Sequence, residues 1–398
     1  MKKITALLLA MLMVFALCAC GNEANDDAAT ENTAATVKAG LVCLHDENSG
    51  YDKNFIDAFK AACEACGVEY VIKTNVAEDQ AAYDAAAELA DAGCNVVFSD
   101  SYGHQQYILQ AAQEFTDVQF TACTGDMAIS SEVENYHNAF ATIFQGRYLA
   151  GVAAGMKLNE MIDKGDITED EAKMGYVGAM PYAEVISGYT SFYLGAKSVC
   201  PSVTMDVVYT GSWYDETLEM EGAKSLIKGG CVLISQHADS MGAPNACQEA
   251  GVPNVSYNGS TQSACPDSYI ISSRINWQPY FEYAIGAVLN GENYDTDYCG
   301  DLETGSVLLT ELNENVAAEG TADKLAEVEA GLKDGSIKVF DTANFTLEDK
   351  EVESYEANVV PDDSFAPDTE AIDNGEFCES TFRSAPYFDI IIDGITLK

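Results

Sequence analysis

The chain has two tryptophans, and each occurs where a predicted strand ends and a loop begins. Trp213 follows the apolar run VTMDVVYT, and Trp277 follows YIIS. Flat side chains at such positions can bind a flat ligand by stacking. Tyrosines, a phenylalanine and short polar side chains occupy similar positions. The candidate ligand-binding residues are Tyr51, Asp52, Phe55, Ser99, Tyr102, Asp126, Met180, Tyr182, Trp213, Asp215, Gln236, His237, Asn258, Asn276 and Trp277.

Two of these assignments have an alternative. Either tryptophan could instead pack at an interface between lobes or at a hinge, because large aromatic side chains are mostly buried. Asp52 could hydrogen-bond donor groups of a ligand, or it could be the N-cap of a helix that begins near Lys53. Both interpretations of Asp52 fit the sequence equally well.

Sequence signatures of catalysis are missing. The chain has no G-x-S-x-G, no G-x-x-x-x-G-K-[ST], no H-E-x-x-H and no G-x-G-x-x-G after its first predicted strand. Cys63 and Cys66 form a C-x-x-C, but they lie inside a predicted helix, where a redox pair gains no acidified thiol. The four histidines, His45, His104, His137 and His237, are widely separated. We therefore expect no enzyme, no cofactor and no metal site.

Two stretches more than a hundred residues apart repeat one α/β unit. The first begins at Asp84 with DAAAELADAGCNVVFSDS, and the second begins at Glu221 with EGAKSLIKGGCVLISQHADS. In each, an apolar helical stripe ends at a glycine, Gly93 or Gly230, and a run with the length of a buried strand follows. Open α/β sheets bind ligands beyond the carboxyl ends of their strands. The duplication therefore predicts two lobes with a ligand cleft between them.

The N-terminus resembles a bacterial lipoprotein signal. Lys2 and Lys3 precede an apolar segment, residues 4–17, that is too short to span a bilayer comfortably, and Leu17-Cys18-Ala19-Cys20 follows. We expect residues 1–20 to be a signal peptide in which Cys20 becomes the acylated anchor, and residues 21–36, polar and acidic, to be a tether. The alternative is a signal peptide without a lipid. The anchor would place the protein on the outer side of the cytoplasmic membrane.

Composition narrows the class of partner. The chain has 20 basic and 64 acidic residues, a formal net charge of −44, which repels nucleic acid and other polyanions. Of its 13 cysteines, Cys18 and Cys20 belong to the signal, so eleven remain, and an odd number cannot all pair. Several lie in apolar strand runs, where a free thiol packs as a small apolar group.

Residues 37–398 are expected to form one two-lobed solute-binding domain. Helical and strand periodicity assigns residues 37–142 and about 270–300 to the first lobe, with the chain returning to it at Tyr269–Ser272. Residues 143–269 and part of 301–398 are assigned to the second lobe. The acidic stretch 341–384 receives no role, and Phe388–Ile392 reads as a last strand.

Several short motifs follow one another along the chain. They are Tyr51-Asp52-Lys53-Asn54-Phe55, Tyr148-Leu149-Ala150-Gly151, Gly175–Met180, Gly195-Ala196-Lys197 with Pro201, and Gly305–Val339. In this order they resemble the D-K-S-F-N, Y-L-A-G, G-F-I-G-G-M, G-A-K and closing segments of the basic membrane protein family of ABC-transporter solute-binding lipoproteins. The resemblance covers about residues 40–340. It implies a type I periplasmic-binding-protein fold, two Rossmann-like lobes joined by a hinge, and a purine nucleoside as ligand.

Departures from the family pattern keep other ligands open. The family's serine and asparagine after D-K are Asn54 and Ile56 here, and no aspartate stands near Tyr257-Asn258-Gly259. We expect a lipid-anchored receptor that delivers a nucleoside-like molecule to an ABC permease and its ATPase. The alternatives are a flavin, a free base or a sugar as ligand, and a surface sensor without transport.

Overall fold

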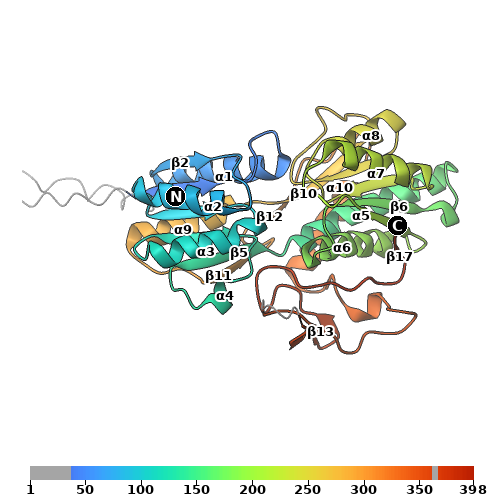
Figure 1. The fold of residues 1–398 in the computed structure, drawn as a ribbon. Coiled ribbons are helices and arrows are strands. Elements are labelled where there is room, and N and C mark those ends of the chain that lie inside the picture. Colours follow the sequence, from blue (N-terminus) through green and yellow to red (C-terminus); the bar gives the residue numbers. More distant parts are fainter. Residues whose placement is uncertain (1–36, 361–365) are drawn as a thin grey trace, which may run out of the picture. The chain divides into compact units, whose positions relative to one another are not determined.

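The computed structural model describes residues 37–360 and 366–398, so the expected signal peptide, Cys20 and the tether lie outside the described residues. Val37–Lys398 forms a compact unit built on two largely parallel sheets (Figure 1). Within the described residues, no helix combines the length and hydropathy needed to cross a membrane.

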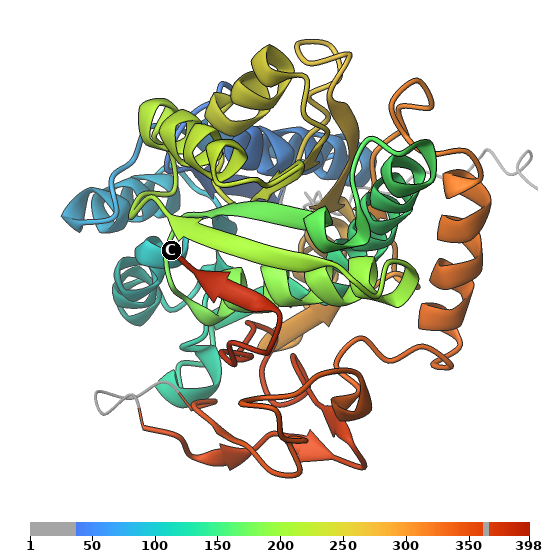
Figure 2. The same cartoon turned by 90° about the vertical axis from the view of Figure 1, so that its right-hand side faces the viewer.

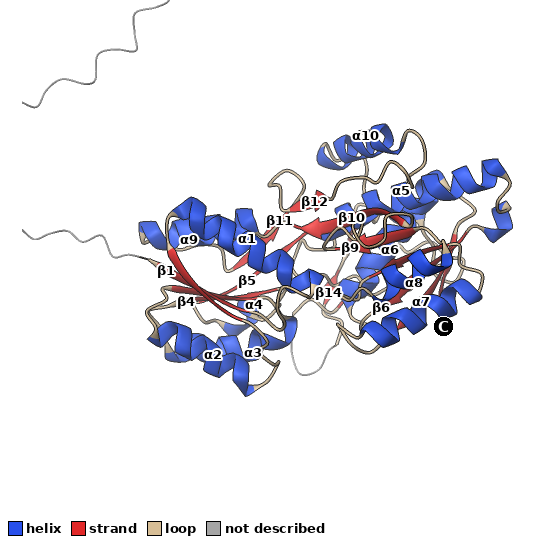
Figure 3. Ribbon diagram, turned by 90° about the horizontal axis from the view of Figure 1, so that it is seen from above, coloured by secondary structure: helices blue, strands red, loops and turns tan. Residues whose placement is uncertain are grey.

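The first sheet has the strand order β11-β5-β4-β3-β1-β2, and all its neighbours are parallel. Its strands are β1 (Lys38–Val42), β2 (Glu69–Lys73), β3 (Val96–Ser99), β4 (Gln119–Cys123), β5 (Tyr136–Ala141) and β11 (Asp297–Gly300). One face is covered by α1 (Gly50–Cys66) and α9 (Gln278–Asn290), the other by α2 (Gln80–Asp91) and α3 (Gln105–Glu114) (Figure 3). The short helix α4 (Ala128–Ser131) lies before β5. We call this sheet with its helices the first lobe.

The second sheet has the order β12-β10-β9-β8-β6-β7-β17. Its strands are β6 (Lys173–Gly178), β7 (Thr204–Tyr209), β8 (Leu233–Gln236), β9 (Asn254–Tyr257), β10 (Tyr269–Ile275), β12 (Val307–Leu309) and β17 (Ile395–Leu397). Helices α5 (Ile143–Lys164) and α6 (Ala183–Val199) cover one face, α7 (Glu216–Lys228) and α8 (Gly242–Ala250) the other, and α10 (Thr321–Lys333) packs on α5. We call this the second lobe.

The duplicated unit occupies equivalent places in the two lobes. Gly93 and Gly230 have φ of 86° and 92°, a backbone conformation that glycine adopts without strain. They end α2 and α7, and they lead into β3 and β8, which are inner strands of the two sheets. The predicted pair of α/β lobes is therefore confirmed.

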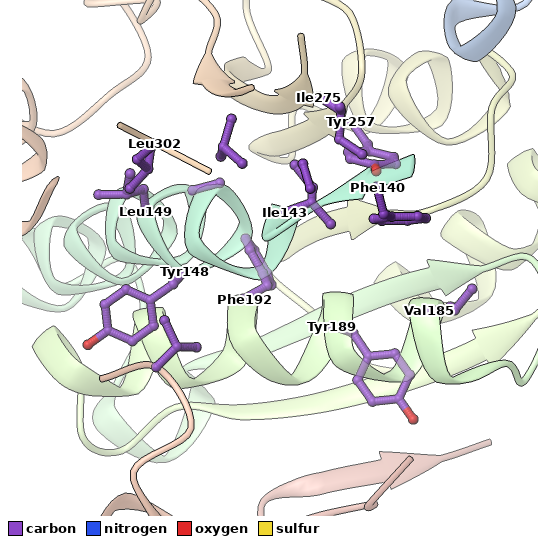
Figure 4. Packing of buried hydrophobic residues seen from close by; sticks show 14 of the residues in the cluster. Phe140, Ile143, Tyr148, Leu149, Val185, Tyr189, Phe192, Tyr257, Ile275 and Leu302 are labelled. Carbon is purple, nitrogen blue, oxygen red and sulfur yellow. The ribbon is translucent and has the colours of Figure 1, made fainter. Parts of the chain in front are cut away.

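Helices α5 and α6 pack so closely that only glycine fits at their contact. A Cβ atom on Gly151 would lie 2.0 Å from the carbonyl oxygen of Phe192, and one on Gly195 would lie 2.0 Å from that of Tyr148. Figure 4 shows buried residues of the surrounding core, including Leu149 of α5 and Phe192 of α6. The Y-L-A-G and G-A-K motifs thus serve helix packing.

Between Val37 and Val360, the chain passes from one sheet to the other three times, at Thr142, at Asn276 and between Asp301 and Ser306. Hydrogen bonds tie these crossovers together: the Asn276 amide donates to the Ser306 carbonyl (2.7 Å), and the Thr142 amide donates to the Gly300 carbonyl (2.8 Å). The expected return to the first lobe at Tyr269–Ser272 is wrong, because β10 pairs with β9 in the second sheet. The chain returns only after Ile275.

Residues 341–398, which we call the C-terminal segment, contact both lobes. The amide of Ser384 donates to Asp297 of β11 (2.7 Å), and Ser187 of α6 donates to Glu379 (2.6 Å). Phe340 stacks on Phe388, with ring centroids 4.4 Å apart. The expected strand at Phe388–Ile392 is not formed. Instead β17 adds to the edge of the second sheet by pairing with β7 (Figure 2).

Candidate functional site

A cavity lies between the two lobes, where the carboxyl ends of their central strands face each other. The first lobe contributes Leu44, His45, Tyr51, Ser101, Tyr102 and Thr124, and the second contributes Glu184, Trp213, His237, Asp239 and Tyr257. Its volume is about 30 Å³, which is room for about one or two water molecules. This volume is too small for a ligand of nucleoside size.

Aromatic rings form a continuous row along this cavity. Tyr102 of the first lobe lies 6.1 Å, between ring centroids, from Tyr182 of the second. Trp213 lies 5.9 Å from Tyr182 and 6.4 Å from His237, and His237 lies 4.8 Å from Tyr257. Rings at these distances can hold a planar ligand between them once the lobes move apart.

Two carboxylates and an imidazole supply the polar groups of the second lobe. Glu184 Oε1 lies 3.3 Å from His237 Nε2. Burial, together with the nearby Arg147 guanidinium, lowers the pKa of His237, so the ring is neutral near pH 7. The Asp239 amide donates to the Trp213 carbonyl (3.0 Å), which joins the loops after β7 and β8. Burial and the nearby Glu219 raise the pKa of Asp239 well above its ordinary value, which favours its protonated form. Glu184 can accept hydrogen bonds from hydroxyl or amine groups of a ligand.

Arg147 lies buried behind this wall, at the start of α5. Its Nη1 donates to the Gln236 carbonyl (3.0 Å), and its guanidinium carbon lies 3.3 Å from the centroid of the Tyr257 ring. Its Nε and Nη2 have no hydrogen-bond partner. Arg147 therefore holds Tyr257 in place, while its Nε and Nη2 groups remain able to donate hydrogen bonds. Its position in the apolar helix FQGRYLAG was the signal that sequence reasoning missed.

Four of the predicted site residues line the cavity: Tyr51, Tyr102, Trp213 and His237. Two more, Asp126 and Tyr182, line a larger adjoining pocket of about 520 Å³ that shares Tyr102, Thr124 and Glu184 with the cavity. Arg383 and Tyr387 of the C-terminal segment line this second pocket, and Arg383 Nη1 lies 3.7 Å from Asp126 Oδ2.

The other predicted residues lie away from the cavity wall. Trp277 and Phe55 are buried and stack on each other, with ring centroids 4.3 Å apart. Asp215 is the N-cap of α7, where it accepts from the Leu218 amide. Asn276 donates to the Gly305 carbonyl at a crossover. Ser99, Gln236 and Asn258 are buried at strand ends, and Met180 packs on the apolar cluster beneath α7 and α8.

Asp52 does not cap α1. Ser49 is the N-cap, and its side chain accepts from the Asp52 amide (3.3 Å). Asp52 is buried in the first turn, where its Oδ1 accepts from the His45 amide (2.7 Å). The N-cap alternative is therefore wrong, because the helix begins three residues earlier than the sequence indicated.

Sequence reasoning did not select seven of the lining residues: Leu44, His45, Ser101, Thr124, Glu184, Asp239 and Tyr257. Most of them follow a strand by one to three residues. Asp239 comes three residues after β8 ends, and Glu184 lies in the first turn of α6. Their short distance from a strand end was the sequence feature that could have identified them as lining residues.

Comparison with known proteins identifies the family. Residues 43–339 match the model of the Bmp family, ABC transporter substrate-binding protein PnrA-like. The chain belongs to the Bmp family. It is similar to the purine-binding protein BAB2_0673 of Brucella abortus, with 31% identity over 73% of this chain and 79% of the relative. It is also similar to the putative ABC transporter glucose-binding protein TsgA13 of Haloferax volcanii, with 30% identity over 66% of this chain and 63% of the relative.

Solved structures agree on the fold. An ABC transporter solute-binding protein from Conexibacter woesei has a TM-score of 0.62 at 20% identity, over 76% of this chain and 98% of that one. One from Aeropyrum pernix has a TM-score of 0.64 at 16% identity, over 79% and 94%. The periplasmic-binding-protein fold predicted from the sequence is confirmed.

As a Bmp family member, the chain is the substrate-binding protein of an ABC transporter. It binds a small molecule outside the cytoplasm and works with an ABC permease. Substrate-binding proteins are not enzymes, in agreement with the missing catalytic motifs. The C-terminal segment lies outside the family match, which ends at residue 339.

Proposed function

We propose that this protein is the lipid-anchored receptor of an ABC importer for a purine nucleoside or a related flat heterocycle. The observation that carries the proposal is the row of rings Tyr102, Tyr182, Trp213, His237 and Tyr257 along the cavity between the lobes. Stacking on aromatic rings favours a planar base over a pyranose.

The acidic side chains on the cavity wall further restrict the chemical class of the ligand. Glu184 and Asp239 line the cavity, and within the described residues no lysine does. The Glu184 carboxylate would repel a phosphorylated ligand, whereas ribose hydroxyls and an exocyclic amine could donate hydrogen bonds to it. A nucleoside or free base therefore fits better than a nucleotide. The similarity to a purine-binding protein of Brucella abortus supports the same ligand class.

Binding would act through the hinge. The cavity is too small for the ligand in this conformation, so the lobes must open, admit the ligand and close on it. Contacts with both lobes exist only in the closed state, so the ligand shifts the population toward that state. The permease can then recognise the closed form.

A sugar is the second candidate, because one relative is named a putative glucose-binding protein. The two are separated by mass spectrometry of small molecules retained by the purified protein, followed by calorimetry with adenosine, inosine, guanosine, adenine and glucose. We expect a purine to bind and glucose not to bind. Binding of glucose without any purine would overturn the proposed ligand class. The family assignment would stand.

A further inference from the structure

Two buried aspartates lie side by side in the first lobe, and among the described residues the basic groups in contact with them are histidine rings. Asp52 and Asp100 are each about 1% exposed or less. Each uses its Oδ1 to accept from a backbone amide, His45 N (2.7 Å) and Leu44 N (3.0 Å) respectively. The Oδ2 atoms of both have no hydrogen-bond partner. Among the described residues, no lysine or arginine forms an ion pair with either carboxylate.

A thiol joins the two aspartates, and an imidazole lies beside Asp100. Cys43 follows β1, Asp100 follows β3, and these strands are parallel neighbours, so the two side chains meet at the sheet edge. The ligand atoms of Cys43, Asp52 and Asp100 all lie within 4.8 Å of one another. His104 is fully buried, and its Nδ1 lies 4.0 Å from Asp100 Oδ1 without a hydrogen-bond partner.

The other nitrogen of His104 is held as it is in metal sites. His104 Nε2 lies 2.9 Å from the Val76 carbonyl oxygen, so Nε2 carries the proton and Nδ1 keeps a free lone pair, 4.0 Å from Asp100 Oδ1. A backbone carbonyl that fixes the tautomer in this way is the usual second partner of a metal-binding histidine.

We propose that Cys43, Asp52, Asp100 and His104 form a binding site for one divalent transition metal ion of the zinc class. Two adjacent buried carboxylates require a proton or a cation, because an unpaired buried charge is costly. The competing occupant is a proton, since burial and the Asp52 charge raise the pKa of Asp100 well above its ordinary value. A proton shared by the two carboxylates, however, leaves the Nδ1 atom of His104 without a partner. A thiolate, an imidazole and carboxylates together match zinc or cobalt rather than calcium or magnesium.

The site has an entry path from the ligand cleft. His45 lines the cavity, and its Nδ1 lies 3.4 Å from Asp52 Oδ2. The His45 side chain is 38% exposed, so its movement would open Asp52 to the cleft. A metal here would brace the loops after β1 and β3, which carry Leu44, Ser101 and Tyr102 of the cavity wall.

Cobalt(II) is the probe, because a cobalt–thiolate bond gives a near-ultraviolet charge-transfer band that surface carboxylates do not give. We expect the wild-type protein to bind one equivalent with this band. Cys43→Ser should lose the band, and Asp100→Asn and His104→Gln should bind cobalt at least about tenfold more weakly. Cys94→Ser, which removes another buried thiol outside the cluster, is the matched control and should bind as the wild type does.

Elemental analysis and a chelator provide a readout that does not depend on the variants folding. Protein purified without chelator should carry about one zinc-class ion per chain, and its Tm should fall when a chelator removes that ion. No metal in the purified protein, together with no cobalt–thiolate band, would show that a proton occupies the cluster and would overturn the proposal. A band that survives in Cys43→Ser would overturn it as well.

Discussion

Trp277 stacks on Phe55, with 4.3 Å between ring centroids and 25° between ring planes. This contact lies where the chain crosses from β10 to α9, and Trp277 is only 2% exposed. Trp213, in contrast, lies on the wall of the cavity. The two tryptophans look equivalent in the sequence. In the structure, Trp277 is a packing residue near the hinge and Trp213 lines the cleft.

Their substitution should therefore separate stability from binding. Trp277→Ala is expected to lower the free energy of unfolding by about 3–5 kcal/mol, because it empties a buried ring site. Trp213→Ala is expected to leave stability nearly unchanged and to weaken binding of a purine by roughly 1–3 kcal/mol. Denaturant unfolding and calorimetry measure the two effects. Unchanged affinity in Trp213→Ala would assign that ring to packing too.

Glu184 is expected to accept a hydrogen bond from the ligand. Glu184→Gln keeps the shape of the side chain but removes its charge, so purine affinity should fall by roughly 1–3 kcal/mol. Glu216→Gln, an exposed acid in the first turn of α7, is the control and should have no effect on affinity. Equal affinities in calorimetry for both variants would exclude Glu184 from ligand recognition.

Glu379 should make stability depend on pH. Burial raises its pKa from 4.5 to about 7, while the unfolded chain keeps the ordinary value. Between those pH values the folded protein retains a proton that the unfolded chain has released, so stability falls as pH rises from about 4.5 to 7. The loss is about 2–4 kcal/mol for this shift.

Glu379→Gln should remove the pH dependence of stability that Glu379 causes, because the amide does not titrate. Its Tm should exceed the wild-type Tm at pH 8 by more than it does at pH 5. Glu356→Gln, an exposed acid of β13 (Glu356–Ala357), should follow the wild-type pH curve. Parallel curves for Glu379→Gln and wild type would show that Glu379 is ionised when folded.

The lipid anchor can be tested independently of the ligand. Cys20→Ala removes the only sulfur at the expected lipid attachment site, so the protein should leave the membrane fraction and appear in the soluble fraction. Fractionation with detergent phase separation measures this. Cys18→Ala is the matched control and should remain with the membrane. A Cys20→Ala protein that still partitions with lipoproteins would contradict the anchor.

Local patterns were enough to predict the repeated units. Each of them is a helix that ends at Gly93 or Gly230 and a short buried strand, and both features depend on residues close together in the chain. The family motifs were readable for the same reason. Tyr51, Tyr102, Trp213 and His237 were found because they follow strands whose carboxyl ends point to the cleft.

The start of α1 shows the limit of such patterns. Both Ser49 and Asp52 are good N-caps by residue type; the sequence left Asp52 open between a cap and a ligand contact, and in the structure Ser49 is the cap. Similarly, YIIS reads as a buried strand in either lobe, and only its pairing with β9 decides which. Neither choice can be made from side-chain type, since the cap depends on where the helix backbone begins and the lobe of YIIS depends on which strand pairs with it.

The sequence by itself therefore determined the two-lobed α/β class, the family and the kind of cleft, because periodicity and glycine positions act locally. Only the tertiary structure decided that Trp277 is buried against Phe55, that Cys43, Asp52 and Asp100 meet beneath the cleft, and that the C-terminal segment spans both lobes. The physical reason is that packing of the helices against the two sheets determines which side chains are buried. The same packing determines which side chains far apart in the sequence come into contact.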